Sequence, residues 1–200
     1  MKHHILITTA VLSYLLLFSL NCFAQMTGKK RSDRKIVEIT KIVQLSKKQE
    51  EKIRQAYDEY MLTVDSSLNV ETDAIHAAEM KYRANKVFHN TLMSTLHDNQ
   101  RLRYIQVTST PEVEAKTRYK LEVLKESGEY SDEELAQMHD EIFDYLMSEK
   151  VVYFRDKYQI QKQKENISRL KNVQPRALKE SNTREKMKGQ GRLRNGKVKW

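Results

Sequence analysis

The histidine best placed for metal chemistry is His76, because it has an acidic residue on either side at helical spacing. Asp73 lies three residues before it and Glu79 three residues after it, so one helical face would carry all three side chains. A metal ion in a protein usually needs three or four converging ligands, of which this stretch offers three weak candidates. A solvated helix face is the simpler interpretation, so we predict no metal site.

Other reactive groups also lack a catalytic pattern. The carboxylates of Asp140, Glu141 and Asp144 cluster, but a helix rich in charge produces such clusters without catalytic meaning. The sequence contains no nucleophile elbow, metalloprotease helix, phosphate-binding loop or dinucleotide fingerprint. These observations predict a protein that is not an enzyme and that needs no cofactor.

The composition indicates which elements hold these side chains. The 200 residues include only 5 Gly and 2 Pro, and 32% of residues are charged. Turn-rich Rossmann and all-β folds depend on Gly and Pro, so both are disfavoured. The sequence predicts an all-α protein built from long amphipathic helices.

The first 24 residues have the pattern of a secretory signal peptide. A polar start is followed by the predominantly apolar stretch 5–20 and then by small residues up to Ala24. We predict cleavage between Ala24 and Gln25; an uncleaved anchor is the alternative, although this stretch is short for a membrane span. Lipoprotein anchoring through Cys22 is disfavoured, because Asn21 and Ser19 match a lipobox poorly. The product would be periplasmic or secreted and free of cysteine, which suits an oxidising compartment.

The formal net charge of +9 is concentrated at the two ends of the chain. Residues 25–35 carry five basic residues against one acidic residue, residues 176–200 carry nine against two, and the body 36–175 is slightly acidic. Residues 181–200 are predicted to be a disordered basic tail. Export argues against nucleic acid as a partner. An anionic membrane or lipopolysaccharide is the alternative partner, and a purely solubilising tail is the simpler interpretation. The basic candidates are Arg176, Lys179, Arg184, Lys186, Lys188, Arg192 and Arg194.

Two helix starts are marked by capping boxes. Ser46 and Gln49 form one box, with Leu45 before it, and open a helix expected over residues 45–68. Ser131 and Glu134 form the second box, with Tyr130 placed to pack on Leu135, and open a helix expected to reach Gln163.

Three further helices are expected between these two. One spans 71–94, with an apolar face that includes Ile75, Tyr82, Val87 and Leu92, and another spans 97–109. Pro111 suits the first position of a helix capped by Thr110, which would run to about residue 126.

The capping segments recur along the chain. The segments 45–49 and 130–134 align with each other, and each is followed by a Leu-x-x-x-Gln pattern, namely Leu96 to Gln100 and Leu170 to Gln174. The pattern predicts two helical-hairpin units, 36–110 and 111–180. Chance similarity between amphipathic helices is the alternative.

The first pair of motifs resembles the Spy/CpxP family of periplasmic proteins, which carry paired L-[ST]-x-x-Q motifs about 50 residues apart. Leu45, Ser46 and Gln49 match the motif, whereas His97 replaces the hydroxyl residue in the second copy. The resemblance covers residues 45–108. It implies helical hairpins that form a curved homodimer and act as an ATP-independent chaperone or envelope-stress adaptor.

The expected function is therefore exported, non-catalytic binding of protein clients or envelope components. Two alternatives remain open: a metal-responsive envelope sensor, and a binder of anionic surfaces that acts through the basic tail. For the numerous Tyr and Met residues, core packing is the default interpretation, with Tyr60 and Tyr145 as the expected core positions.

Overall fold

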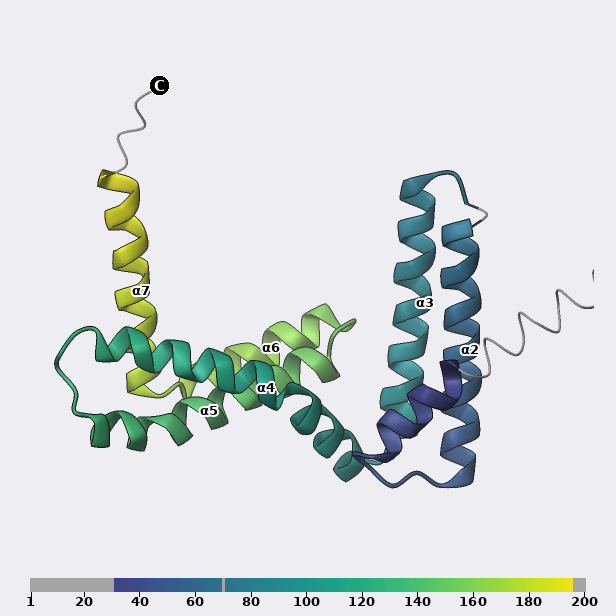
Figure 1. Cartoon of the computed structure of the whole chain (residues 1–200), viewed down its shortest axis with the longest axis horizontal. Helices are drawn as coiled ribbons and strands as arrows, with labels where there is room; N and C mark the ends of the chain where they lie inside the picture. Colours follow the sequence, from purple (N-terminus) through teal and green to yellow (C-terminus); the bar gives the residue numbers. More distant parts are fainter. Residues whose placement is uncertain (1–30, 70, 196–200) are drawn as a thin grey trace, which may run out of the picture. The chain divides into compact units, whose positions relative to one another are not determined.

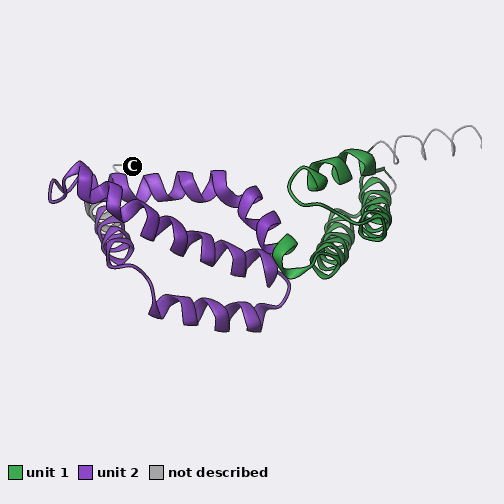
Figure 2. Cartoon of the chain, turned by 90° about the horizontal axis from the view of Figure 1, so that it is seen from below, with its two compact units in different colours: residues 1–101 green, residues 102–200 purple. Residues whose placement is uncertain are grey.

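The computed structural model of the chain describes residues 31–69 and 71–195. Every regular element in these residues is an α-helix, which confirms the predicted fold class (Figure 1). The chain divides between Arg101 and Leu102 into two compact units (Figure 2). This division lies nine residues before the unit boundary expected at 110/111, and each unit has its own buried core.

Unit 1 is a three-helix assembly. A short helix over residues 31–40 precedes α2 (Lys47–Asn69) and α3 (Ala74–Thr95), and α2 packs against α3 as an antiparallel hairpin (Figure 1). Ion pairs Arg31–Asp65 (2.9 Å) and Asp33–Arg54 join the short helix to α2. The buried apolar residues of the unit are Ile36, Ile39, Val43, Ile53, Ala56, Ala77, Leu92, Met93 and Leu96.

The middle of the hairpin contains a cluster of aromatic side chains from both helices. The Phe88 ring stacks on Tyr60 at 5.7 Å between centroids and meets Tyr57 edge-on at 5.3 Å. Tyr60 is only half-buried, although the sequence suggested a core position. Such ring pairs stabilise helix packing by about 0.5–1.5 kcal/mol beyond the area they bury.

The expected apolar face of α3 differs from the observed one. The side chains of Ile75, Tyr82 and Val87 are 82%, 57% and 57% exposed, whereas His89 is buried. The helix also starts later than residue 71, because the Asp73 carboxylate accepts the backbone N–H of Ile75 at 2.8 Å and so caps α3. Leu92 is buried as expected, but it is joined by Ala77, His89 and Met93 rather than by Ile75, Tyr82 and Val87, so the pattern of apolar residues misplaced most of the buried face.

Pro111 is not a helix start. Helix α4 runs from Asp98 to Lys125 without a break and contains Pro111 in its interior. A proline removes one backbone hydrogen bond of the helix. The Thr108 and Thr110 hydroxyls donate to the carbonyls of Tyr104 and Gln106 in the turn just before it, at 2.7 and 2.8 Å. The two helices expected over 97–109 and 111–126 are thus one.

Unit 2 packs the rest of α4 with α5 (Asp132–Arg155), α6 (Ile160–Asn172) and α7 (Arg176–Asn195). The predicted capping box at the start of α5 is confirmed: the Ser131 side chain accepts from Glu134 N–H, and Glu134 accepts from Ser131 N–H at 2.8 Å. Tyr130 packs against the buried core cluster of this unit, to which its expected partner Leu135 belongs. The core cluster consists of Val113, Leu124, Leu135, Ile142, Tyr145, Leu146, Met147, Ala177 and Leu178.

Helix α5 ends at Arg155, eight residues before the expected end at Gln163, although no Gly or Pro lies there. The cause is Asp156, whose side chain is fully buried. It accepts two hydrogen bonds from Arg155 (2.9 and 2.7 Å) and one from Asn166 of α6 (2.8 Å). A carboxylate bonded to both sides of the turn thus fixes α6 against the end of α5.

Residues 181–195 are not the disordered tail that their composition suggested, because they continue α7. Ala177, Leu178 and Ser181 are buried, and Ser181 donates to the Lys120 carbonyl at 2.9 Å. The Lys and Arg residues that looked like a solvated tail, together with Glu185 and Met187, are good helix formers. Residues 196–200 lie outside the described residues.

The predicted signal peptide, its cleavage site and Cys22 also lie outside the described residues. Within residues 31–69 and 71–195, the search for a helix with the length and apolar character of a membrane span finds none.

Replacing Asp156 by Ala should lower the free energy of unfolding by about 2–3 kcal/mol at neutral pH, because Arg155 and Asn166 would lose their acceptor. The Arg155 hydrogen bond holds the pKa of Asp156 below its usual value. This contribution is therefore complete above the unfolded-state pKa of about 4 and disappears as the pH falls through the lower folded-state pKa.

Urea unfolding at several pH values would measure the effect. Asp144→Ala is the matched control, because Asp144 is an exposed carboxylate of α5 and its loss should change stability by less than about 0.5 kcal/mol. Equal stability of the two variants at neutral pH would contradict the role of Asp156.

Candidate functional site

The two Leu-x-x-x-Gln segments of unit 1 each close a turn at the start of a helix. At the start of α2, Gln49 Oε1 accepts the backbone N–H of Ser46 at 2.9 Å, and Ser46 Oγ accepts the N–H of Gln49 at 3.3 Å. At the start of α4, Gln100 Oε1 accepts the backbone N–H of His97 at 2.9 Å. The first capping box is confirmed, and the second motif keeps the glutamine half of the box without a hydroxyl.

The two glutamines also bond to each other's segment. Gln49 Nε2 donates to the Thr95 carbonyl and to Gln100 Oε1, both at 2.9 Å. Gln100 Nε2 donates to the Gln44 carbonyl and, at 3.4 Å, to Gln49 Oε1. Gln44 and Thr95 each directly precede the leucine of a motif, so the contacts are reciprocal. We call this pair of side chains the glutamine clasp.

The clasp is partly sheltered from water. Gln49 is 8% exposed and Leu96 is 1% exposed, whereas Gln100 and Leu45 are half-buried. Arg101 closes the same turn by donating to the carbonyls of Met93 (2.8 Å) and Leu96 (3.0 Å). The clasp therefore joins the base of α2 to the loop between α3 and α4 and satisfies carbonyls that the helix ends leave open.

The sequence indicated both motifs but not their contact. The signal that could have found it is the residue type: a capping box is satisfied by Glu or Gln, whereas only Gln can accept in its own box and donate elsewhere. Both motifs of unit 1 end in Gln, which is what a reciprocal contact requires.

Unit 2 does not repeat this arrangement. Glu134 closes its own box, but a carboxylate has no proton to donate to a second segment. Leu170 lies in the last turn of α6, and Gln174 follows the end of that helix at Asn172. The two Leu-x-x-x-Gln patterns therefore match in sequence but not in structure. Leu170–Gln174 lies at the end of a helix, whereas Leu96–Gln100 lies at the start of one.

Asp73, His76 and Glu79, the residues considered for a metal site, each interact with a different partner. Asp73 caps α3, His76 Nδ1 contacts Glu71 Oε2 at 2.7 Å, and Glu79 pairs with Arg83. Across the described part of the chain, no group of three or more His, Cys, Asp or Glu side chains is arranged to hold a metal ion. The alternative of a metal-responsive sensor gains no support from this geometry.

Several basic residues of the expected tail bond to acidic residues of unit 2. Arg184 pairs with Glu129 and with Glu180 (2.5 and 2.7 Å), and Lys188 pairs with Glu126. Arg176, Lys179 and Lys186 are exposed, and the side chains of Arg192 and Arg194 lie outside the described atoms. Part of the charge assigned to anionic partners therefore holds α7 in place.

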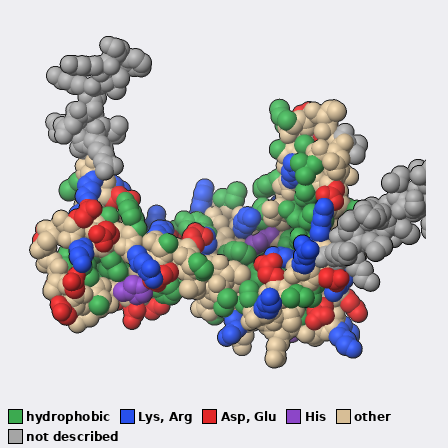
Figure 3. Space-filling view, viewed as in Figure 1, with side chains coloured by type: hydrophobic (Ala, Val, Ile, Leu, Met, Phe, Trp, Pro, Cys, Tyr) green, Lys and Arg blue, Asp and Glu red, His purple; other side chains and the backbone are tan. Residues whose placement is uncertain are grey.

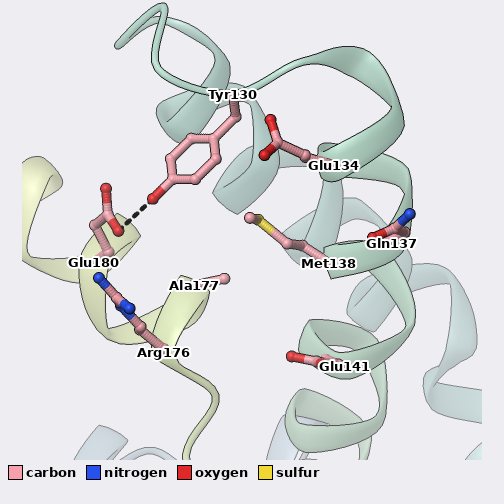
Figure 4. A pocket seen from close by; sticks show the side chains of 8 residues that line it. All are labelled: Tyr130, Glu134, Gln137, Met138, Glu141, Arg176, Ala177 and Glu180. Carbon is pink, nitrogen blue, oxygen red and sulfur yellow. Dashed lines mark hydrogen bonds between the residues drawn. The ribbon is translucent and has the colours of Figure 1, made fainter.

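A pocket of about 420 Å³ lies between α5 and α7 (Figure 4). On one wall, Tyr130 donates its hydroxyl proton to Glu180 at 2.6 Å, and Met138 points into the space between the helices. Hydrogen bonds from Tyr130 and Arg184 lower the pKa of Glu180, so this carboxylate is already engaged. The remaining lining residues are Glu134, Gln137, Glu141, Arg176 and Ala177. No nucleophile and base are paired here, so the pocket suggests no reaction.

The largest unexplained feature is the apolar surface of the hairpin. Five large apolar side chains of α2 and α3 are more than half exposed: Leu62, Leu68, Ile75, Tyr82 and Val87. Figure 3 shows hydrophobic side chains at the surface of this hairpin, interspersed with charged ones. We call these five residues the hairpin apolar surface. A contiguous apolar patch is typical of a contact surface for other molecules, whereas single exposed apolar side chains are common on any protein.

Comparison with known proteins adds no relative: no family model, no curated protein and no solved structure matches the chain.

The clasp can be tested apart from the caps by Gln49→Glu. A glutamate still accepts the Ser46 N–H but cannot donate to Thr95 or Gln100, so unfolding free energy should fall by about 1–3 kcal/mol. The matched control is Glu134→Gln, which keeps a capping box that has no second contact and should change stability by less than about 0.5 kcal/mol. Urea unfolding followed by circular dichroism measures both. If Gln49→Glu left the free energy of unfolding unchanged, the clasp would contribute nothing beyond capping.

Proposed function

We propose that this chain is an exported, non-catalytic binding protein that shields apolar segments of unfolded proteins. The observation that carries the proposal is the hairpin apolar surface, with Leu62, Leu68 and Ile75 at 68%, 63% and 82% exposure. Export rests on the signal-like residues 1–24 and on the absence of cysteine after Cys22. The resemblance of the two glutamine motifs to the Spy/CpxP family points to the same class of activity.

The chemistry of the surface suits clients of varied sequence. Aliphatic and tyrosine side chains bury apolar area without directional demands, and Tyr adds a hydroxyl for polar neighbours. Charged residues such as Arg83 and Lys86 lie among them on α3 and keep the free protein soluble. Such a surface would bind briefly and weakly, as a chaperone that uses no ATP requires.

The base of the hairpin is suited to present this surface. The clasp and the buried Leu92 and Leu96 secure the end of the hairpin opposite to the α2–α3 connection. The helix over 31–40 pairs with Arg54 and, nearer the connection, with Asp65 of α2. Leu62, Leu68 and Ile75 lie toward the connection end of the two helices, so client contacts there would not need to disturb the clasp.

The proposal predicts that Leu62→Ser, Ile75→Ser and Val87→Ser, combined in one variant, will abolish most suppression of aggregation of a denatured client. Because all three side chains are mostly exposed, the variant should unfold at nearly the wild-type temperature. Light scattering during refolding of a diluted client, at equimolar chain, is the measurement.

The control variant combines Leu102→Ser, Val107→Ser and Met187→Ser, which removes three exposed apolar side chains from unit 2. It should keep wild-type activity. Equal loss in both variants would indicate nonspecific hydrophobic contact, and no suppression by the wild-type chain would refute the proposed function itself.

A further inference from the structure

Helix α6 and its flanking turns carry a strongly basic surface. Between residues 157 and 179 there is a single carboxylate, Glu165, against seven basic residues. Their side chains lie in exposed positions: Lys157, Lys162, Lys164, Arg169, Lys171, Arg176 and Lys179. Five of the seven lie within the body 36–175, which as a whole is slightly acidic.

The basic residues of α6 lie along the edges of its outer face. The inner face is fixed by the buried Ile167 and by Asn166, which donates to Asp156 at 2.8 Å. Residues seven apart share a helical edge, so Lys164 lies in line with Lys171 on one edge and Lys162 with Arg169 on the other. The two rows thus flank the water-facing surface of the helix from opposite sides, with the exposed Glu165 between them.

These charges differ from other basic residues of unit 2 in having no acidic partner. Lys120, Lys125 and Lys150 on α4 and α5 pair with Glu185, Asp132 and Glu112. Among the described residues, Lys164, Arg169 and Lys171 form no ion pair, and Lys162 lies 3.8 Å from Asp156, which is already bonded to Arg155. The fold therefore leaves the positive charge of Lys164, Arg169 and Lys171 without a paired carboxylate among the described residues.

Two aliphatic side chains mark the ends of the same helix. Ile160 at its start is 64% exposed, and Val173 just after its end is 71% exposed. Each lies beside basic positions, and both would be free to enter an apolar layer beneath a charged one. Lysine stems also cover apolar surface while their ammonium groups stay at the polar boundary.

We infer that α6 docks the protein on an anionic phospholipid surface. Lys and Arg side chains near such a surface are attracted to its phosphate groups, and the two aliphatic ends provide shallow insertion. Only Arg176 and Lys179 are shared with the basic end considered from sequence, and the site does not depend on the hairpin apolar surface. A chain that binds clients with unit 1 could then hold them near a membrane through unit 2.

A nucleic acid fits this surface less well. Five of the seven basic residues are Lys, which acts as a point charge, whereas Arg is favoured for the two-pronged recognition of phosphates and bases. The nearby Tyr158 ring is covered by the Lys157 ammonium at 5.2 Å and is not presented for base stacking. The diffuse arrangement suits many lipid headgroups at once.

Vesicle co-sedimentation tests the inference with the chain that begins at Gln25. That chain keeps all described residues and lacks the apolar stretch 5–20, which would itself enter vesicles. We expect binding to vesicles of equal parts phosphatidylcholine and phosphatidylglycerol at about 20 mM salt, little binding at about 300 mM salt, and none to pure phosphatidylcholine.

The variant Lys164→Gln, Arg169→Gln, Lys171→Gln should weaken binding at least about tenfold, since each basic residue near the surface contributes about fivefold. The matched control Lys48→Gln, Lys52→Gln, Lys86→Gln removes the same charge from exposed positions of α2 and α3 and should bind as wild type. Circular dichroism should show the same helix content in all three proteins.

Ile160→Ser with Val173→Ser should weaken binding severalfold while leaving its salt dependence unchanged. Equal weakening by the α6 variant and the control would assign the attraction to net charge and overturn the inference. Duplex DNA that competes with the vesicles for the same three basic residues, and binds more tightly than they do, would overturn it in favour of a nucleic-acid site.

Discussion

Unit 1 depends on two side-chain amides that meet at the base of its hairpin. A helix start leaves backbone N–H groups without partners, and the preceding loop leaves carbonyl groups that also lack partners. Gln49 satisfies both, because its oxygen accepts from its own cap while its nitrogen donates to the segment before α4. Gln100 does the same in reverse. The two amides therefore hold the loops at residues 44–46 and 95–97 together around the buried Leu96.

The sequence predicted the elements far better than the contacts between them. The capping boxes at Ser46 and Ser131 are local signals, and both occur where expected. The clasp joins residues 51 positions apart, and nothing within either motif specifies its partner. Similarly, Asp156 ends α5 through Asn166 of the next helix, so a search for Gly or Pro could not find that break. Local rules describe helix starts, whereas these stops and pairings depend on groups brought together by folding.

Composition predicted the location of unpaired positive charge poorly. The basic end of the chain looked like a solvated tail because counting residues ignores where their counterions lie. In the folded chain, Glu180 and Glu185 take hydrogen bonds from Tyr130 and Lys120, and the pKa of each carboxyl is lowered accordingly. Arg184 and Lys188 reach back to acidic residues of the α4–α5 connection. Half of α7 is therefore attached by charge, and the uncompensated positive face lies instead on α6.

The two surfaces proposed for binding differ in character: the hairpin apolar surface is hydrophobic, and the exposed face of α6 is basic. An exposed aliphatic side chain gains nothing for the folded monomer, and an unpaired lysine beside other lysines is mildly destabilising. Ile75 at the start of α3 and Lys171 at the end of α6 are both exposed, so a polar or neutral residue could replace either without loss of packing. Their stability costs are small individually. For both residues, the proposed contacts with other molecules supply a reason for the residue type that packing in the monomer does not.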